Sequence, residues 1–115
     1  MTPQNIMDGM QKKNRELSMK NDELPELAEN MASAERDFNV AYAQKILTLK
    51  SEGMAITLAK EVAKGDKPIA DLLFQFRVAE AVYDSAKKKI AALNMGIDTY
   101  RSLLSWQKQE YGKCA

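Results

Sequence analysis

Few side chains in this sequence could carry out catalysis or hold a metal. The 115 residues include no histidine and a single cysteine, Cys114. Acid–base catalysis by histidine and zinc sites made of cysteine and histidine are therefore excluded. The sequence also has no glycine-rich phosphate loop, no G-x-S-x-G elbow and no H-E-x-x-H motif. We expect no catalytic residue, no metal site and no cofactor, and hence a protein that is not an enzyme.

Carboxylates are the remaining candidates for a metal site. Glu26 and Glu29 are three residues apart and could face a neighbouring helix. Di-metal sites in helical bundles, however, also use two Glu-x-x-His motifs, which a chain without histidine cannot supply. We therefore interpret these carboxylates as part of a solvated helix surface.

Aromatic and basic side chains gather towards the C-terminus. Trp106 lies between Arg101 and Lys108, and proteins that bind single-stranded nucleic acid combine stacking aromatic residues with cationic ones. These three residues are the candidate nucleic-acid contacts. The net charge is only +1, so any attraction to phosphates must be local. Binding of nucleic acid is the alternative hypothesis for this chain.

A long helix must position these residues. Its predicted range, 68–111, has apolar or small residues at every third or fourth position, and at roughly 1.5 Å per residue it would be about 65 Å long. Gly96 interrupts it, so we expect a bend or a close helix contact there. We call this heptad stripe the seam; it comprises Ile69, Leu72, Phe76, Ala79, Tyr83, Ala86, Ile90, Leu93, Ile97, Tyr100, Leu104, the discordant polar Gln107 and Tyr111.

The segment 25–52 is the predicted partner of the seam. We expect Pro25 in its first turn and Gly53 at its C-terminal cap. The two segments together predict an all-α fold, an antiparallel hairpin of two long helices with coiled-coil-like packing. The apolar stripe of this first segment consists of Leu27, Met31, Ala34, Phe38, Tyr42, Ile46 and Leu49.

A short connecting helix is predicted over residues 54–64. We expect Thr57 as its N-cap, Leu58 and Val62 on its packing face, and Gly65 as its end, with Asp66 capping the next helix. We also expect it to fold back over three apolar residues that lie off the seam, namely Leu73, Phe74 and Val78.

The chain should divide into an N-terminal helical extension, residues 1–23, and a hairpin domain, residues 24–115. The 25–52 helix spans about 42 Å, so more than 20 Å of the seam needs another cover. Either the N-terminal segment or a second copy must supply it. We therefore predict oligomer or partner contacts at the C-terminal end of the seam, at Ile97, Tyr100, Leu103, Leu104, Trp106 and Tyr111.

Location and association follow from simpler features. The longest uncharged run, Ile90–Ile97, is far shorter than the roughly 20 residues that a bilayer span needs. The first ten residues lack the pattern of a secretory signal, and a lone cysteine suits a reducing compartment. We expect a cytoplasmic protein with no membrane partner. Apolar residues beside the seam, such as Val82 and Leu103, favour packing of more than two helices and a homo-oligomer.

The order of several short motifs resembles that of a known group of proteins. Ala34, Tyr42 and Ala43 come first, followed by residues 51–53 (SEG), 57–66 (TLAKEVAKGD), 79–83 (AEAVY) and 102–106 (SLLSW). Over residues 30–111 this order is similar to small helical proteins encoded in phages and prophages, often near recombination or single-strand-binding genes. The resemblance implies a phage-derived, cytoplasmic accessory protein of a bacterial host and brings no catalytic residues. The leading hypothesis is a structural or interaction protein that acts through helix faces.

Overall fold

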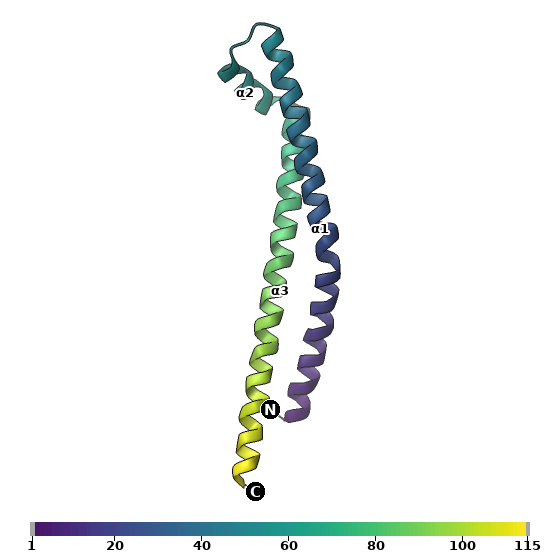
Figure 1. Ribbon diagram of the computed structural model, residues 1–115, viewed down its shortest axis with the longest axis vertical. Helices are drawn as coiled ribbons and strands as arrows, with labels where there is room; N and C mark the ends of the chain where they lie inside the picture. Colours follow the sequence, from purple (N-terminus) through teal and green to yellow (C-terminus); the bar gives the residue numbers. More distant parts are fainter. Residues whose placement is uncertain (1, 115) are drawn as a thin grey trace. The chain divides into compact units, whose positions relative to one another are not determined.

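The computed structural model describes the backbone of residues 2–114 and the side chains of residues 2–110. Regular structure within this range is entirely helical: α1 is Pro3–Ser51, α2 is Ile56–Gly65 and α3 is Lys67–Cys114 (Figure 1). The prediction of an all-α chain with two long helices and a short connecting one is confirmed. The chain forms two compact units. The terminal unit combines the residues up to Pro25 with those from Ser85 onward, and the middle unit is Glu26–Asp84.

The first helix, α1, begins at Pro3. The Thr2 hydroxyl oxygen accepts a hydrogen bond from the N–H of Asn5 at 3.2 Å, and the Thr2 carbonyl accepts one from the N–H of Ile6 at 3.1 Å. Thr2 is therefore the N-cap, and Pro3 occupies the first helical position. The N–H of that position has no partner within a helix, so proline loses no hydrogen bond there.

α1 continues through Pro25, where the sequence predicts a new helix to begin. Proline has no N–H to bond to the carbonyl four residues before it, and inside a helix it costs about 3 kcal/mol. Pro25 is exposed, whereas Leu24 and Leu27 are half-buried and continue one stripe past it. The helix boundary predicted at Pro25 is therefore wrong, because packing of the stripe outweighs the local cost of proline.

α1 ends in a Schellman motif with Gly53 at its C-terminal cap, so the prediction of this cap is confirmed. Gly53 has φ of 92°, a left-handed conformation that suits glycine. Its N–H donates to the carbonyl of Lys50 at 3.0 Å, and the N–H of Met54 donates to the carbonyl of Leu49 at 3.1 Å. Met54 also packs against the buried cluster that contains Leu49, which is the apolar contact typical of this motif.

α2 begins one residue after Ala55 rather than at Thr57. Ala55 has an extended backbone (φ −64°, ψ 143°), no side-chain cap bond is formed, and the Ala55 carbonyl accepts the N–H of Ala59 at 2.9 Å. The N-cap prediction at Thr57 is wrong. Because the chain leaves Gly53 in a fixed direction and Met54 is held by packing, the helix starts as soon as the backbone allows.

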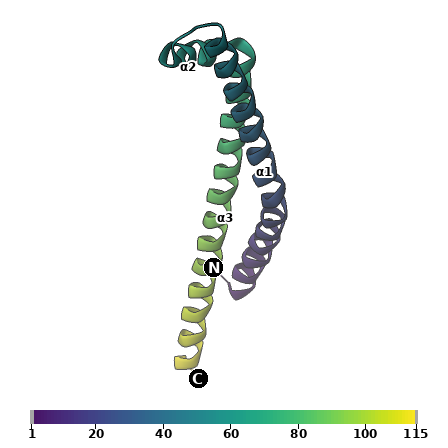
Figure 2. The same cartoon turned by 45° about the horizontal axis from the view of Figure 1, so that its top comes forward.

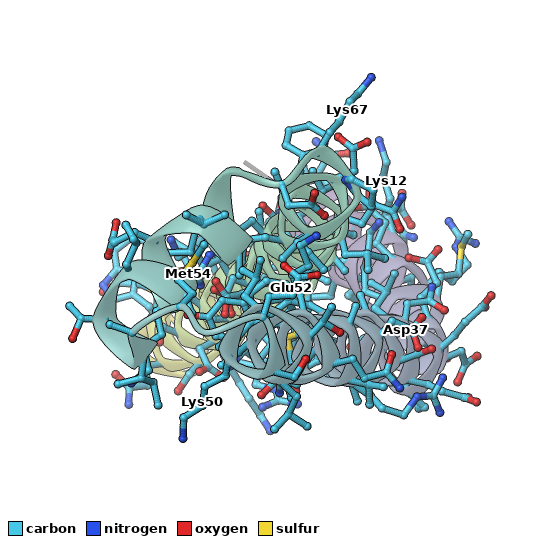
Figure 3. All side chains as sticks on the ribbon, turned by 90° about the horizontal axis from the view of Figure 1, so that it is seen from above. Lys12, Asp37, Lys50, Glu52, Met54 and Lys67 are labelled. Carbon is cyan, nitrogen blue, oxygen red and sulfur yellow. The ribbon has the colours of Figure 1, made fainter. Side chains whose placement is uncertain are left out.

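α2 packs through its two alanines, Ala59 and Ala63, which are fully buried. Methyl side chains let two helix backbones approach closely. Figure 3 shows the side chain of Lys50, near the end of α1, pointing outward. The cluster formed in this way consists of Leu49, Ala59 and Ala63, with Tyr42, Ile46 and Met54 packed against it.

The predicted packing face of the short helix is therefore wrong. Leu58 and Val62 remain 55% and 39% exposed. Phe74 and Val78, which this helix was expected to cover, are 69% and 46% exposed. The cause is size, since the larger side chains would hold α2 farther from α1 than the alanines do.

A single residue, Asp66, connects α2 to α3. Its backbone is extended (φ −67°, ψ 126°), its N–H donates to the carbonyl of Ala63, and its own carbonyl accepts the N–H of Ala70 at 2.8 Å. Its carboxylate lies 3.9 Å from the ammonium of Lys45 on α1. Asp66 therefore precedes α3 as predicted, whereas Gly65 is the last residue of α2 and has no left-handed conformation.

Burial along both long helices follows the predicted stripes. All twelve seam residues from Ile69 to Gln107 are buried or half-buried. The seven stripe residues predicted between 25 and 52 are buried or half-buried too. Within the middle unit, Phe38 and Tyr42 of that stripe stack with ring centroids 5.5 Å apart. The heptad spacing was therefore sufficient to predict which face of each helix is covered.

In the terminal unit, the first part of α1 packs against the last part of α3. Gly9 lies so close to Tyr100 that a β-carbon on Gly9 would fall 2.6 Å from the Cζ atom of the tyrosine ring. Farther along α1, the side-chain stem of Lys13 covers Gly96. This is the close helix contact that was one of the two expectations for Gly96. Residue numbers rise along α1 as they fall along α3, so these two segments run antiparallel (Figures 1 and 2).

These contacts show which segment of the chain covers the C-terminal end of the seam. The sequence left two alternatives, the N-terminal segment or a second copy. Within the terminal unit the N-terminal segment lies there, and Ile6, which is fully buried, is its most deeply packed side chain. Along the residues that the structure describes, no helix has the length and apolar character needed to cross a membrane.

Gly9 and Gly96 are both helical glycines of the terminal unit, and alanine is expected to have opposite effects at the two positions. Alanine favours a helix by about 1 kcal/mol over glycine. Gly96→Ala would meet only the flexible end of Lys13, 2.9 Å away at Cε, so we expect a stability gain of up to about 1 kcal/mol. Gly9→Ala would displace the Tyr100 ring, and overpacking of this kind costs about 1–3 kcal/mol. Urea unfolding followed by circular dichroism measures both effects.

The matched control for this pair is Tyr100→Leu. In that background Gly9→Ala should no longer destabilise, because the ring it displaces is absent. Equal stability of Gly9→Ala and Gly96→Ala in the natural background would contradict the close fit.

Gly53→Ala should destabilise the chain through its backbone alone. No atom lies within 4 Å of the position of an added β-carbon, so the expected loss of about 1–2 kcal/mol comes from the left-handed conformation. Gly65→Ala is the control, since Gly65 is equally open but has no positive φ. In thermal unfolding, the melting temperature of Gly53→Ala should be lower than that of the natural chain. The melting temperature of Gly65→Ala should be equal to it or higher.

Candidate interaction surfaces

The six residues predicted as partner contacts differ in burial, and one of them lies outside the described side chains. Ile97 is 3% exposed, and Tyr100 and Leu104 are half-buried. Leu103 and Trp106 are 36% and 60% exposed. The side chain of Tyr111 lies outside the described residues. The first group is covered within the terminal unit, so only Leu103 and Trp106 present apolar surface to a partner.

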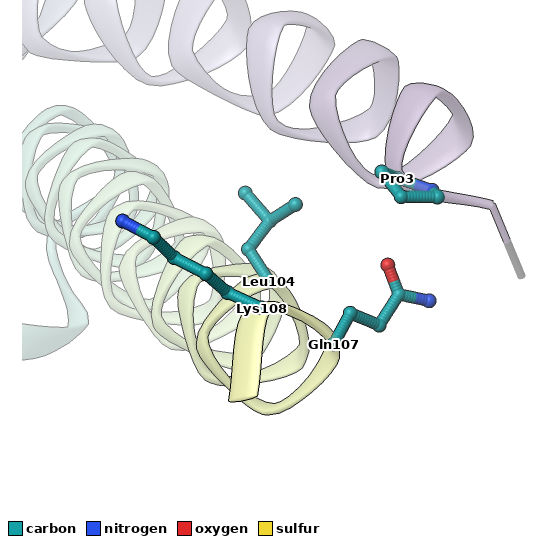
Figure 4. A pocket seen from close by; sticks show the side chains of 4 residues that line it. All are labelled: Pro3, Leu104, Gln107 and Lys108. Atoms are coloured by element: carbon teal, nitrogen blue, oxygen red, sulfur yellow. The ribbon is translucent and has the colours of Figure 1, made fainter. Parts of the chain in front are cut away.

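A small pocket lies where the first turn of α1 meets α3. Its volume is about 290 Å³, and it is lined by Pro3, Leu104, Gln107 and Lys108. In Figure 4 the side chains of Leu104 and Gln107 extend from α3 towards Pro3, whereas Lys108 runs along α3 with its ammonium away from Pro3. The cationic head therefore does not point into the pocket.

The three candidate nucleic-acid contacts do not share a face of α3. At about 100° per residue, Arg101 and Lys108 lie within ~20° of each other, and Trp106 is ~140–160° away from both. Arg101 also pairs with Asp98, whose carboxylate is 3.4 Å from the guanidinium. A strand held by the two cations would not reach the indole for stacking, so the geometry does not assemble the site that the sequence suggested.

An exposed apolar face runs along the first part of α3, in the middle unit. Phe74, Val78 and Val82 are 69%, 46% and 45% exposed and follow one another at intervals of four residues. The exposed Ala81 lies among them. We call these four residues the Phe74 face. It lies on the side of the helix away from the seam, so α3 is apolar on two sides and only one of them is covered.

A second exposed face lies on the last part of α3, in the terminal unit. Met95, Leu103 and Trp106 are 71%, 36% and 60% exposed and lie within about 80° of one another on the helix. Sequence reasoning named Leu103 and Trp106 but missed Met95. The same i, i+8, i+11 spacing that places them together could have identified it.

The ion pairs of the described residues are mostly local. Pairs that join residues three apart on one helix include Lys20–Glu23, Glu61–Lys64, Arg77–Glu80 and Asp98–Arg101. Exposed pairs of this kind contribute little to stability. Among residues 2–110, no group of three or more acidic or cysteine side chains is arranged to hold a metal ion.

The separation of Trp106 from the cations predicts the outcome of a titration with single-stranded DNA. Trp106 is the single tryptophan, so its fluorescence reports only this position. We expect little change on addition of DNA, and no salt-sensitive quenching. Strong quenching that weakens with salt and is lost in both Arg101→Ala and Lys108→Ala would contradict this geometry and favour the alternative hypothesis.

Comparison of the sequence with protein families, with curated proteins and with solved structures finds no match.

Proposed function

We propose that this chain is a non-enzymatic interaction protein of phage or prophage origin that associates with itself through exposed helix faces in the bacterial cytoplasm. The observation that carries the proposal is the pair of exposed apolar faces on α3. Burying a Phe or Val side chain fully is worth about 1.5–3 kcal/mol, and three of the four residues of the Phe74 face keep nearly half or more of their surface exposed. Rows of this kind on a helix are typical of association surfaces.

The architecture proposed for this function is an antiparallel hairpin of α1 and α3 with coiled-coil-like packing. Two features support it: burial follows the heptad stripes of both helices, and the contacts of the terminal unit run antiparallel. A hairpin of two helices has two broad outer sides. It can therefore present an apolar face without disturbing the covered seam.

The distribution of exposed apolar residues favours association over a small-molecule function. Besides the Phe74 face, Leu58 and Val62 on α2 and Leu47 on α1 are exposed in the middle unit. Ligand sites are concave and enclose most of the ligand. The exposed apolar residues lie on convex helix surfaces, and the 290 Å³ pocket is at the lower limit for such sites.

Sedimentation tests this proposal directly. We expect the average mass to rise above that of a single chain between micromolar and sub-millimolar concentration, because burial of the exposed faces drives association. The effect should persist at raised salt, since apolar contacts are not screened. A well-folded chain that sediments as a monomer throughout this range would overturn the self-association proposed here.

A further inference from the structure

We propose that the Phe74 face binds the same face of a second copy, with the two α3 helices antiparallel about a two-fold axis that passes between Val78 and Ala81. This inference rests on the proposed function and deepens it by naming the surface, the partner and the orientation. The occupant is a second copy. One edge of the face carries a basic and an acidic residue, and each meets its opposite charge when a second copy of the helix runs in the reverse direction.

The shape of the face suits such a pairing. Phe74, Val78 and Ala81 recur at intervals of four and three, which is the core spacing of two packed helices. In an antiparallel pair centred between Val78 and Ala81, each valine lies over the small alanine of the other copy. Each Phe74 then lies one turn outside this central pair. Val82, which is 45% exposed, covers the rim.

The charges fix the orientation. Arg77 and Asp84 are exposed and lie on the same edge of the face, two turns apart. Antiparallel helices bring equivalent edges together, so Arg77 of one copy faces Asp84 of the other, and symmetry makes this pair twice. The layers of Val78 on Ala81 and the pairing of Arg77 with Asp84 require the same register.

A parallel pairing of the same faces is disfavoured. It would set the edge that carries Arg77 against the opposite edge of the second copy, where the apolar Val82 lies, so Arg77 would lack an acidic partner. The guanidinium of Arg77 lies 5.4 Å from the ring centroid of Phe76 and 3.3 Å from a Glu80 carboxylate oxygen. Both partners lie towards the seam, so Arg77 must turn towards the Phe74 face when the second copy binds.

The test measures self-association of full-length variants by sedimentation equilibrium. Phe74→Ser should weaken association about tenfold or more, because it removes an apolar anchor from both copies. Arg77→Asp and Asp84→Arg should each weaken it several-fold by placing like charges opposite each other. The double variant Arg77→Asp/Asp84→Arg should restore association towards the natural level.

Restoration reports contact between copies. Residues seven apart lie two turns, about 10 Å, from each other on one helix, so the swapped charges cannot pair with each other within a chain. Leu47→Ser is the matched control, because Leu47 is 67% exposed in the same unit but lies off the Phe74 face. Circular dichroism should show unchanged helicity for every variant, since each altered side chain is exposed.

The outcomes separate this inference from the proposed function. If the natural chain associates but Phe74→Ser and the charge variants associate equally well, the Phe74 face is not the self-contact and the proposed function stands. If either charge reversal weakens association and the double variant does not restore it, the antiparallel register is wrong. If the natural chain is a monomer at every concentration, both proposals fail.

Discussion

The structure depends on the burial of one stripe on each long helix. A helix side chain can be covered only where it recurs every three or four residues, so each helix has a narrow protected face and a wide exposed one. The buried apolar set of the described residues is accordingly small, namely Ile6, Leu49, Ala59, Ala63, Ile69, Ala86, Leu93 and Ile97. With so little enclosed volume, no single site dominates the stability of the chain, and close contacts such as Gly9 with Tyr100 matter more than they would in a globular core.

The stripes could be predicted from the sequence because heptad spacing and burial have the same physical origin. The same reasoning failed where two local rules competed with packing. Proline usually marks a helix start, yet α1 passes through Pro25 because the stripe continues beyond it. Leu58 and Val62 form the more apolar face of the short helix, yet the smaller alanines pack. Apolar character alone does not reveal how closely two backbones can approach.

The candidate surfaces were only half predictable for a related reason. The seam-end residues were identified as unpartnered because the length of a separate 25–52 helix left them uncovered. Since α1 is continuous from Pro3 to Ser51, its first turns reach Tyr100 and Leu104. The apolar residues off the seam, Phe74 and Val78, were noticed but were expected to be covered by α2. Whether they are covered depends on where α2 packs, and no periodic pattern in the sequence specifies that.

The contact of Gly9 with Tyr100 has a consequence for alignment. Stripes that repeat every seven residues are nearly degenerate, because two helices displaced by one heptad still match apolar to apolar. Such a displacement would set Tyr100 against Thr2 or Glu16 in place of Gly9, with a side chain where the ring now meets bare backbone. One glycine opposite one large ring thus distinguishes the native alignment from its neighbours, which a stripe of interchangeable leucines and isoleucines could not do.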